Sequence, residues 1–562
     1  MTVLLTVVVG GLLFAARAGQ YPEIARIRSY LDAQNGLLLE PTVFYDRSGE
    51  IPLYRLAPPE VERDFLAYED FSPQLVNVAI AVNDPDYWNT FGYDQDSIPV
   101  TLISRLLTPL ASDDVLMRYW LVSSLLYSEG KQQVLAWYLN SSHYGQQTVG
   151  VEQAAQLYLG KSAADLSLAE AALLTAVQQT PALNPFDALS AALENKDRLL
   201  NDLFTQGYIS EAEYQSAMAE ILLIEPSITA EEPPSLVQRA IDAISQEIPT
   251  EQLLLGGYRI ITTMDVDLQR QSECVIQEQL NRINDPDFKI DPMVLENCPA
   301  ARFLAVLPPS ETPLDYSAVG STVLLDPRTS QVLALVEQPD LQPERIRLPQ
   351  QPGTSLAPFV ALTGFSVGES PATLRWDIPG DDPVEFMPYL QEEQFYQGPL
   401  RTREAIIEQD ALVLAEWMAD LGETEVIRFA QTAGLPSLAA NSTAQMLFTG
   451  SDLSLAEQAH AYGVFANLGI QYGVQIGEDS QPAPQVVLNV FAPGNELMLL
   501  NCTTVQSQVL VGADLSYLVH DVLSDEVLRR GAYGYPNSLS IGRPVGGLFS
   551  FSDFGQQRWT LG

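Results

Sequence analysis

Residues 138–161 read YLNSSHYGQQTVGVEQAAQLYLGK, and residues 166–185 continue as LSLAEAALLTAVQQTPALNP. The second stretch opens with a capping box, in which the Ser167 hydroxyl can accept an amide proton of the first turn while Glu170 reaches back to the cap amide. The alanine- and leucine-rich run that follows predicts a buried helix, which ends near Asn184 and its neighbouring prolines. The surrounding sequence reads as mainly helical.

Other local signals extend outward from this helix. Residues 226–256 suit a linker, and Tyr258–Thr263 reads as a strand. Thr322–Leu325 and Val332–Val336 predict a hairpin closed by the turn Asp326–Ser330, because apolar β-branched runs flank a turn-forming segment. Two more capping boxes predict helix starts, at Ser210-x-x-Glu213 and Ser454-x-x-Glu457.

The composition excludes several classes of protein. The chain has 562 residues, of which 46% are hydrophobic and 18% charged, so it can build several globular cores and is neither disordered nor collagen-like. It carries 71 acidic against 29 basic residues, for a formal net charge of -42. Nucleic acid is therefore not an expected partner, because phosphate binding requires clustered lysine and arginine.

The cysteines and histidines are few and widely separated. A structural zinc site needs several nitrogen or sulfur ligands at short spacing, and none is offered, so no metal and no cofactor is expected. The odd, sparse cysteine count predicts inert thiols rather than a disulfide framework. The residues concerned are Cys274, Cys298, Cys502, His143, His460 and His520.

The N-terminus is strongly apolar. Thr2–Ala16 would form roughly 22 Å of helix, short of the ~30 Å hydrocarbon core of a bilayer. Residues 1–19 are therefore interpreted as a signal anchor, with a cleaved signal peptide as the alternative, because Ala16-Arg17-Ala18 offers a small-residue cleavage site. In either case the rest of the chain is expected outside the cytoplasm, held at the cell membrane by the anchor or secreted after cleavage.

Taken together, these segments resemble class A penicillin-binding proteins, the bifunctional cell-wall synthases. The resemblance covers nearly the whole chain, and its motifs occur in the family's order. They are Tyr45–Gly49, Tyr138–Asn140, Tyr144-Gly145, Gly150-Val151, Ala154-Ala155, Tyr158–Lys161, Leu166–Leu174, Gln178–Pro185, Gly257–Gln269, Leu325–Val336, Pro352-Gly353, Pro358-Phe359, Ala461–Gly469 and Arg543–Val545.

The resemblance implies a multidomain α plus α/β fold. A lysozyme-like helical glycosyltransferase domain is expected over residues 40–225 and a small linker region over 226–318. A penicillin-binding, transpeptidase-like domain with a central antiparallel sheet is expected over 319–562, truncated at its C-terminus. The family polymerises lipid II into glycan strands and cross-links stem peptides. It implies lipid II, peptidoglycan and other cell-wall synthases as partners, with membrane attachment through the N-terminal segment.

The segments that match the glycosyltransferase motifs lack the family's catalytic residues. Asn83 stands where the family has its catalytic Glu, and an amide cannot accept a proton at neutral pH. Arg118 takes the position of the family's second Glu, while Asp114 and Val115 replace its Arg-Lys pair. The family's GGSTITQQ stretch reads IPVTLISR over residues 98–105. The resemblance therefore predicts that this half lacks its general base.

Some polar residues remain near these positions. Asp84, Asp86 and Glu129, with Arg118, leave open the alternative that the glycosyltransferase half keeps partial activity. A neighbouring residue on a helix points about 100° away, so a carboxylate one position on does not reach the same place. Asp84 and Asp86 are therefore expected to belong to a solvated helix or loop face.

The transpeptidase motifs are similarly altered. Acyl transfer in this class uses Ser-x-x-Lys, Ser-x-Asn and Lys-Thr-Gly elements, in which a lysine activates the serine. Thr354 takes the nucleophile position and Ala357 the lysine position. The other two elements align with Gln409-Asp410-Ala411 and Leu548-Phe549-Ser550.

The absence of lysine from this region does not depend on any alignment. The chain has four lysines, and none follows Lys289. Arginine cannot replace lysine as a base, because its pKa exceeds 12. His460 and His520 are conceivable bases but are expected to be structural.

The sequence therefore predicts a pseudoenzyme that acts as a scaffold or regulator of peptidoglycan synthesis. Two alternatives remain: a partly active glycosyltransferase with a dead transpeptidase half, and a non-catalytic module that binds glycan or peptide.

Overall fold

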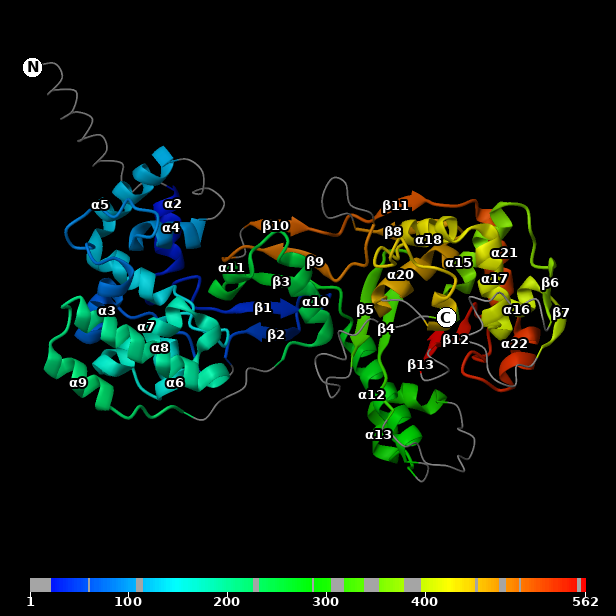
Figure 1. Cartoon of the computed structure of the whole chain (residues 1–562), viewed down its shortest axis with the longest axis horizontal. Helices are drawn as coiled ribbons and strands as arrows, with labels where there is room; N and C mark the ends of the chain where they lie inside the picture. Colours follow the sequence, from blue (N-terminus) through cyan, green and yellow to red (C-terminus); the bar gives the residue numbers. More distant parts are fainter. Residues whose placement is uncertain are drawn as a thin grey trace, which may run out of the picture. The chain divides into compact units, whose positions relative to one another are not determined.

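The computed structural model describes residues 22–58, 61–107, 115–225, 232–285, 288–304, 318–337, 353–378, 396–449, 453–474, 482–494, 497–552 and 557–562. The chain divides into two compact units (Figure 1). Unit 1 comprises residues 1–261 and 489–500, and unit 2 comprises residues 262–488 and 501–562. The predicted signal anchor or signal peptide over residues 1–19 lies outside the described residues. Within the described ranges, no helix is both long and apolar enough to cross a bilayer.

Unit 1 is built around a helical core. The buried helix α7 begins at a capping box formed by Ser167 and Glu170, as predicted. α7 ends at Gln179, just before Pro181, rather than at Asn184 and Pro185. Asn184 instead caps the next helix by accepting the amide protons of Phe186 and Asp187, and Pro185 occupies its first position. The helices are α2 (Pro22–Tyr30), α3 (Pro73–Asn83), α4 (Ile98–Leu107), α5 (Val115–Asn140), α6 (Val151–Leu159), α7 (Leu168–Gln179), α8 (Pro185–Thr205), α9 (Glu211–Ala219), α10 (Ser235–Ile244) and α11 (Thr250–Leu255).

The core of these helices is almost entirely apolar. Every residue from Ala169 to Val177 on α7 is buried, which is the pattern of a central helix with neighbours on all sides. α7 packs against α3 and α8, while α4 packs against α5. Helix α5 is broken at Gly130, whose φ of 81° separates two helical stretches.

A five-stranded sheet completes unit 1, in the order β10-β9-β3-β1-β2. It joins three distant parts of the chain. β1 pairs antiparallel with β2 and parallel with β3, with Phe44 opposite both Tyr54 and Ile260. The strands are β1 (Thr42–Tyr45), β2 (Pro52–Leu56), β3 (Arg259–Thr262), β9 (Val487–Phe491) and β10 (Met498–Asn501).

Unit 2 combines helices with antiparallel strand pairs. The predicted hairpin is confirmed, with Thr322 opposite Val336 and Asp326 opposite Gln331. In the described part of the chain the strands form the pairs β4-β5, β6-β7, β8-β11 and β12-β13. They are β4 (Thr322–Asp326), β5 (Gln331–Val336), β6 (Leu374–Asp377), β7 (Gly398–Arg401), β8 (Ile470–Gly473), β11 (Gln506–Val509), β12 (Leu548–Ser552) and β13 (Gln557–Leu561).

The helices of unit 2 enclose a second core, centred on α15 and α17. The predicted capping box at Ser454 and Glu457 starts α20, just as the one at Ser210 and Glu213 starts α9 in unit 1. The expected combination of a helical domain and an α/β domain is therefore confirmed. The helices are α12 (Val266–Asn284), α13 (Pro292–Asn297), α15 (Ala357–Ser366), α16 (Thr402–Glu408), α17 (Ala411–Leu421), α18 (Glu423–Thr432), α19 (Met446–Thr449), α20 (Leu455–Ala466), α21 (Ala513–Leu523) and α22 (Glu526–Tyr533).

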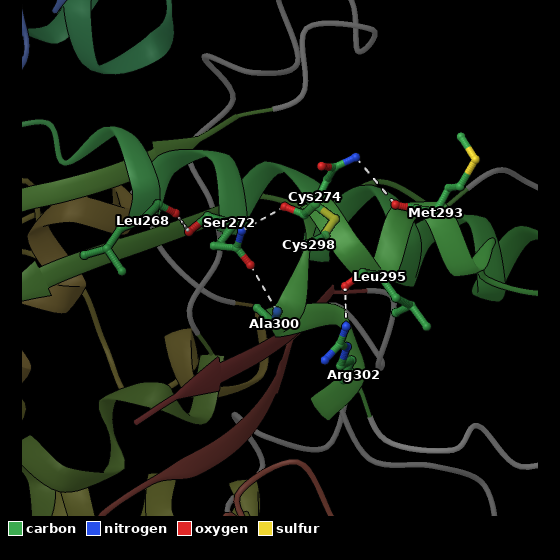
Figure 2. Close-up of a disulfide and its surroundings, with 10 residues drawn as sticks. Leu268, Ser272, Cys274, Met293, Leu295, Cys298, Ala300 and Arg302 are labelled. Atoms are coloured by element: carbon green, nitrogen blue, oxygen red, sulfur yellow. Dashed lines mark hydrogen bonds between the residues drawn. A yellow bond between two sulfur atoms is a disulfide. The ribbon is translucent and has the colours of Figure 1, made fainter.

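The prediction of three inert thiols is wrong for two of them. Cys274 on α12 and Cys298 at the end of α13 form a disulfide (Figure 2), whereas Cys502 is free. Gln271, one turn before Cys274, donates to the carbonyl of Asn297 (3.2 Å) and accepts from the amide of Ala300 (3.0 Å). The pair could not be predicted from the sequence, because the cysteines are 24 positions apart and only the reversal of the chain between α12 and α13 brings them together.

Candidate functional site

Asn83 is the last residue of α3, and its side chain is used in packing. Its amide donates to the carbonyl of Ala79 (3.0 Å) and to the side-chain oxygen of Gln178 on α7 (3.3 Å). The residue at the expected position of the catalytic Glu therefore connects two core helices. The position at which the resemblance predicts a general base thus carries an amide, which cannot accept a proton at neutral pH.

Asp84 is buried, and the expectation that it lies on a solvated face is wrong. One of its carboxylate oxygens accepts the amide proton of Ile98 (3.2 Å), at the first residue of α4. Burial raises the pKa of Asp84, against the opposing effects of that hydrogen bond and of Lys131. A carboxylate at a helix N-terminus complements the helix dipole, so Asp84 has a structural partner. Asp86, by contrast, is exposed, as predicted.

Lys131 follows the break in α5 and fastens the loop after α3. Its ammonium group donates to the carbonyls of Tyr87 (2.6 Å), Trp88 (3.0 Å) and Thr90 (2.6 Å). The Tyr87 hydroxyl in turn donates to the carbonyl of Lys131 (2.5 Å). Burial lowers the pKa of Lys131, and Asp84 opposes this effect. Because its ammonium group donates to three backbone carbonyls, Lys131 has a structural role rather than the role of a pyrophosphate ligand.

The guanidinium group of Arg105 is likewise bound by groups of the protein itself. It donates to the carbonyl of Tyr138 (3.2 Å) and to the hydroxyls of Ser141 (2.9 Å) and Ser142 (3.1 Å), and it lies over the Tyr138 ring. Gln178 donates to the same Ser142 hydroxyl (2.8 Å). The side chains of Asn83, Gln178, Ser142 and Arg105 thus form one partly buried polar cluster. Among the described residues, Arg105 forms no ion pair with a carboxylate.

The remaining candidates of unit 1 belong to other contacts. Arg118, in the first turns of α5, is half-buried, and its Nε atom has no hydrogen-bond partner among the described residues. Glu129 pairs with Arg28 of α2. Asp114 lies outside the described residues, and Val115 is the first residue of α5. Of these residues, the structure thus assigns a structural ion pair to Glu129 alone among those it describes.

Two of the matched transpeptidase positions do come together. Thr354 lies in a short 3-10 helix, η6 (Gly353–Leu356), and Ser550 lies on β12, which packs against it. Their hydroxyl oxygens are 3.2 Å apart, and both residues are buried, with exposed fractions of 3% and 0%. The sequence placed both residues at motif positions but could not show that their hydroxyls form a buried pair.

The neighbouring matched positions are apolar or bound to the backbone. Ala357, at the lysine position, is the fully buried first residue of α15, and Leu548 is fully buried on β12. Phe549 packs edge-on against Tyr533, with 4.6 Å between ring centroids. Gln409 ends α16 in a left-handed conformation and donates to the carbonyl of Ile406. Ala411 begins α17.

The two histidines differ in burial. His460 is buried on α20, where its Nδ1 lies 2.8 Å from the Ser330 hydroxyl and its Nε2 lies 2.9 Å from the Gln471 amide nitrogen. Burial lowers the pKa of His460 to about 4, so the ring is neutral at pH 7. It connects α20 to the β4–β5 turn and to β8, in agreement with its expected structural role. His520 is half-buried on α21.

Among the described acidic groups of unit 2, Asp410 has the most clearly shifted pKa. It caps α17 by accepting the amide proton of Val413 (3.0 Å). Burial raises the pKa of Asp410 from 3.8 to about 6, with smaller contributions from Asp377 and Glu408. The folded state thus favours the protonated carboxyl. Ionising this carboxyl therefore lowers the free energy of unfolding. The loss is absent below pH 3.8, grows as the pH rises and is complete above about pH 6.

We expect D410N to be more stable than the wild type at pH 8, by about 2 kcal/mol, because asparagine caps helices well and carries no charge. The gain should shrink at pH 5. Thermal unfolding at both pH values measures it, with D291N at the exposed cap of α13 as the matched exchange. An equal change in D410N stability at both pH values would contradict the assignment.

Comparisons with known proteins identify homologues of both units. The Transglycosylase family model matches residues 119–204. Penicillin-binding protein 2D of Bacillus subtilis is 22% identical over 514 residues, which cover 83% of this chain and 68% of that protein. Penicillin-binding protein 1C of Escherichia coli is 24% identical over 546 residues, covering 89% and 65%. Penicillin-binding protein 1A of Aquifex aeolicus is 27% identical over 248 residues, covering 40% and 34%.

A solved structure is also similar. The crystal structure of penicillin-binding protein 1A from Haemophilus influenzae aligns with 93% of this chain and 86% of that one, at 17% identity and a TM-score of 0.47. The chain thus spans between about a third and about two thirds of the length of the three relatives named above.

Proposed function

We propose that this chain, which is similar to class A penicillin-binding proteins, is a non-catalytic homologue that acts as a scaffold or regulator of peptidoglycan synthesis in the cell envelope. The observation that carries the proposal is the buried Thr354–Ser550 hydroxyl pair, which lies beside an apolar Ala357. A serine or threonine hydroxyl is a weak nucleophile without a neighbouring base. The chain contains no lysine after Lys289 to provide one.

The helical unit supports the same proposal. Glycosyl transfer from a lipid pyrophosphate needs a base on the acceptor hydroxyl and cations on the leaving group. Asn83 is an amide bound to Gln178, while Lys131 and Arg105 donate to backbone and hydroxyl oxygens of the fold itself. The framework of a glycosyltransferase can persist without its chemistry, because fold and function are separable.

Location outside the cytoplasm is part of the proposal. Disulfides persist in oxidising compartments and are rare in the cytosol, so the Cys274–Cys298 bridge supports an extracytoplasmic position for unit 2. The apolar run Thr2–Ala16 supports membrane attachment or export. Lipid II or peptidoglycan and other cell-wall synthases are the partners that such a scaffold would have.

We expect the purified full chain to show no covalent labelling by a fluorescent β-lactam and no polymerisation of lipid II. Denaturing gels measure the first and chromatography of glycan products the second, with an intact class A synthase as the positive control. A label that survives denaturation and disappears in T354A would overturn the proposal for unit 2. Glycan product that disappears in D84N would overturn it for unit 1. Binding of lipid II without product would favour a binding module over a scaffold.

A further inference from the structure

A short extended segment follows α9 in unit 1 (Figure 1). Residues 220–225 read EILLIE, and alternate side chains face solvent: Ile221 is 88% exposed and Leu223 82%, whereas Leu222 and Ile224 pack against the core of unit 1. A period of two is that of a β-strand with one buried face. In the described part of the chain, however, this segment belongs to no sheet. We call residues 220–225 the unpaired strand.

The backbone of the unpaired strand has unused hydrogen-bonding groups. The Glu225 amide donates to the carbonyl of Tyr158 on α6 (3.0 Å). The N–H and C=O groups of Ile221–Ile224 have no hydrogen-bond partner among the described residues. An extended segment with free backbone donors and acceptors can add a further strand alongside itself, and its exposed side chains then cover those of the added strand.

The unpaired strand is fixed at both ends. A side-chain oxygen of Glu220 accepts from the hydroxyl of Ser167, the cap of α7 (2.7 Å), and Glu225 is held by its bond to Tyr158. Between these anchors, Leu222 and Ile224 fasten the inner face to the core. A strand that is already held in its extended form loses little conformational freedom when it binds a second one.

The charges around the unpaired strand indicate the chemistry of its partner. No lysine or arginine occurs between Arg198 and Arg239, whereas glutamates lie at both ends of the strand and in the first turn of α9. Lys161 follows the glycine that Glu225 contacts, but it already pairs with Glu170 (2.7 Å). An acidic border of this kind attracts basic side chains and repels acidic ones.

The same charges disfavour a second copy of the chain. Two-fold antiparallel pairing of the strand with itself would place Glu220 opposite the Glu225 of a second copy, and like charges directly opposite each other destabilise a sheet. We propose that the unpaired strand docks an extended segment of another protein, in which apolar and basic side chains alternate, by strand addition. The contact is independent of catalysis, so it does not rest on the pseudoenzyme proposal.

Peptide binding to the purified full chain tests this proposal. The probe is a fluorescein-labelled peptide of alternating valine and lysine, and fluorescence anisotropy measures its affinity. We expect I221S/L223S to bind it at least about tenfold more weakly than the wild type, because the apolar side chains that the peptide would cover are lost. V367S/V527S is the matched control and should bind normally, since Val367 and Val527 are 69% and 80% exposed in unit 2.

Two further peptides separate strand pairing from simple attraction between charges. A peptide of alternating valine and glutamate should not bind, because the acidic border would repel it. A peptide of alternating proline and lysine keeps the positive charge but lacks the N–H groups that proline removes, so it should also fail to bind. Hydrogen exchange should show that the valine–lysine peptide slows the exchange of the Ile221–Ile224 amides.

Three outcomes would overturn the proposal. The first is no binding of the valine–lysine peptide to the wild type. The second is equal binding by the wild type and I221S/L223S, or equal binding of the proline–lysine peptide, because either would indicate attraction between charges alone. The third is protection of the Ile221–Ile224 amides that rises with protein concentration in the absence of peptide, which would indicate a second copy of the chain on this strand.

Discussion

Replacing Trp417 by alanine is expected to destabilise unit 2 by about 3–5 kcal/mol, the range for removing a large buried aromatic side chain. Trp417 is fully buried on α17, its indole nitrogen donates to Glu369 (2.6 Å), and Arg375 lies 5.0 Å above its ring. Gly364 on α15 faces the ring so closely that a Cβ atom there would lie 2.5 Å from it. The substitution would therefore leave a cavity between α15 and α17.

Hydrogen exchange of the α15 and α17 amides measures this loss locally, which suits a protein with two units better than a single melting curve. W417F is the matched variant, because it keeps most of the ring but loses the bond to Glu369. It should cost about 1–2 kcal/mol. A W417A variant whose α15 and α17 amides exchange as slowly as those of the wild type would show that this contact is not central to the core.

The second large effect concerns the disulfide. We expect C274S/C298S to lose about 3 kcal/mol of local stability, because the bridge restricts the unfolded chain between the two cysteines. The loss should concentrate in α13 and in the 3-10 helix η5 (Pro299–Phe303), which Cys274 and Gln271 hold against α12. Hydrogen exchange of these segments measures it.

C502S is the control for the disulfide, since it removes the free thiol and should leave these segments unchanged. Peptide mapping without reductant should recover Cys274 and Cys298 as one linked species from protein made in an oxidising compartment. Two free thiols in that sample would contradict the assignment and remove its support for an extracytoplasmic position.

The sequence by itself predicted what depends on local signals. The capping boxes at Ser167, Ser210 and Ser454 start helices as expected, because the capping hydrogen bonds span only three residues. The β4–β5 hairpin was predicted for the same reason, since its turn lies between two short apolar runs. The absence of lysine after Lys289 is also a property of the sequence alone and needs no coordinates.

The tertiary structure decided what depends on residues far apart in the chain. It paired Cys274 with Cys298, brought the hydroxyls of Thr354 and Ser550 together across 196 positions, and buried Asp84 against the start of α4. It also built one sheet from three separate segments. Such pairings depend on how helices and strands pack, and the local pattern of any one segment does not contain that information.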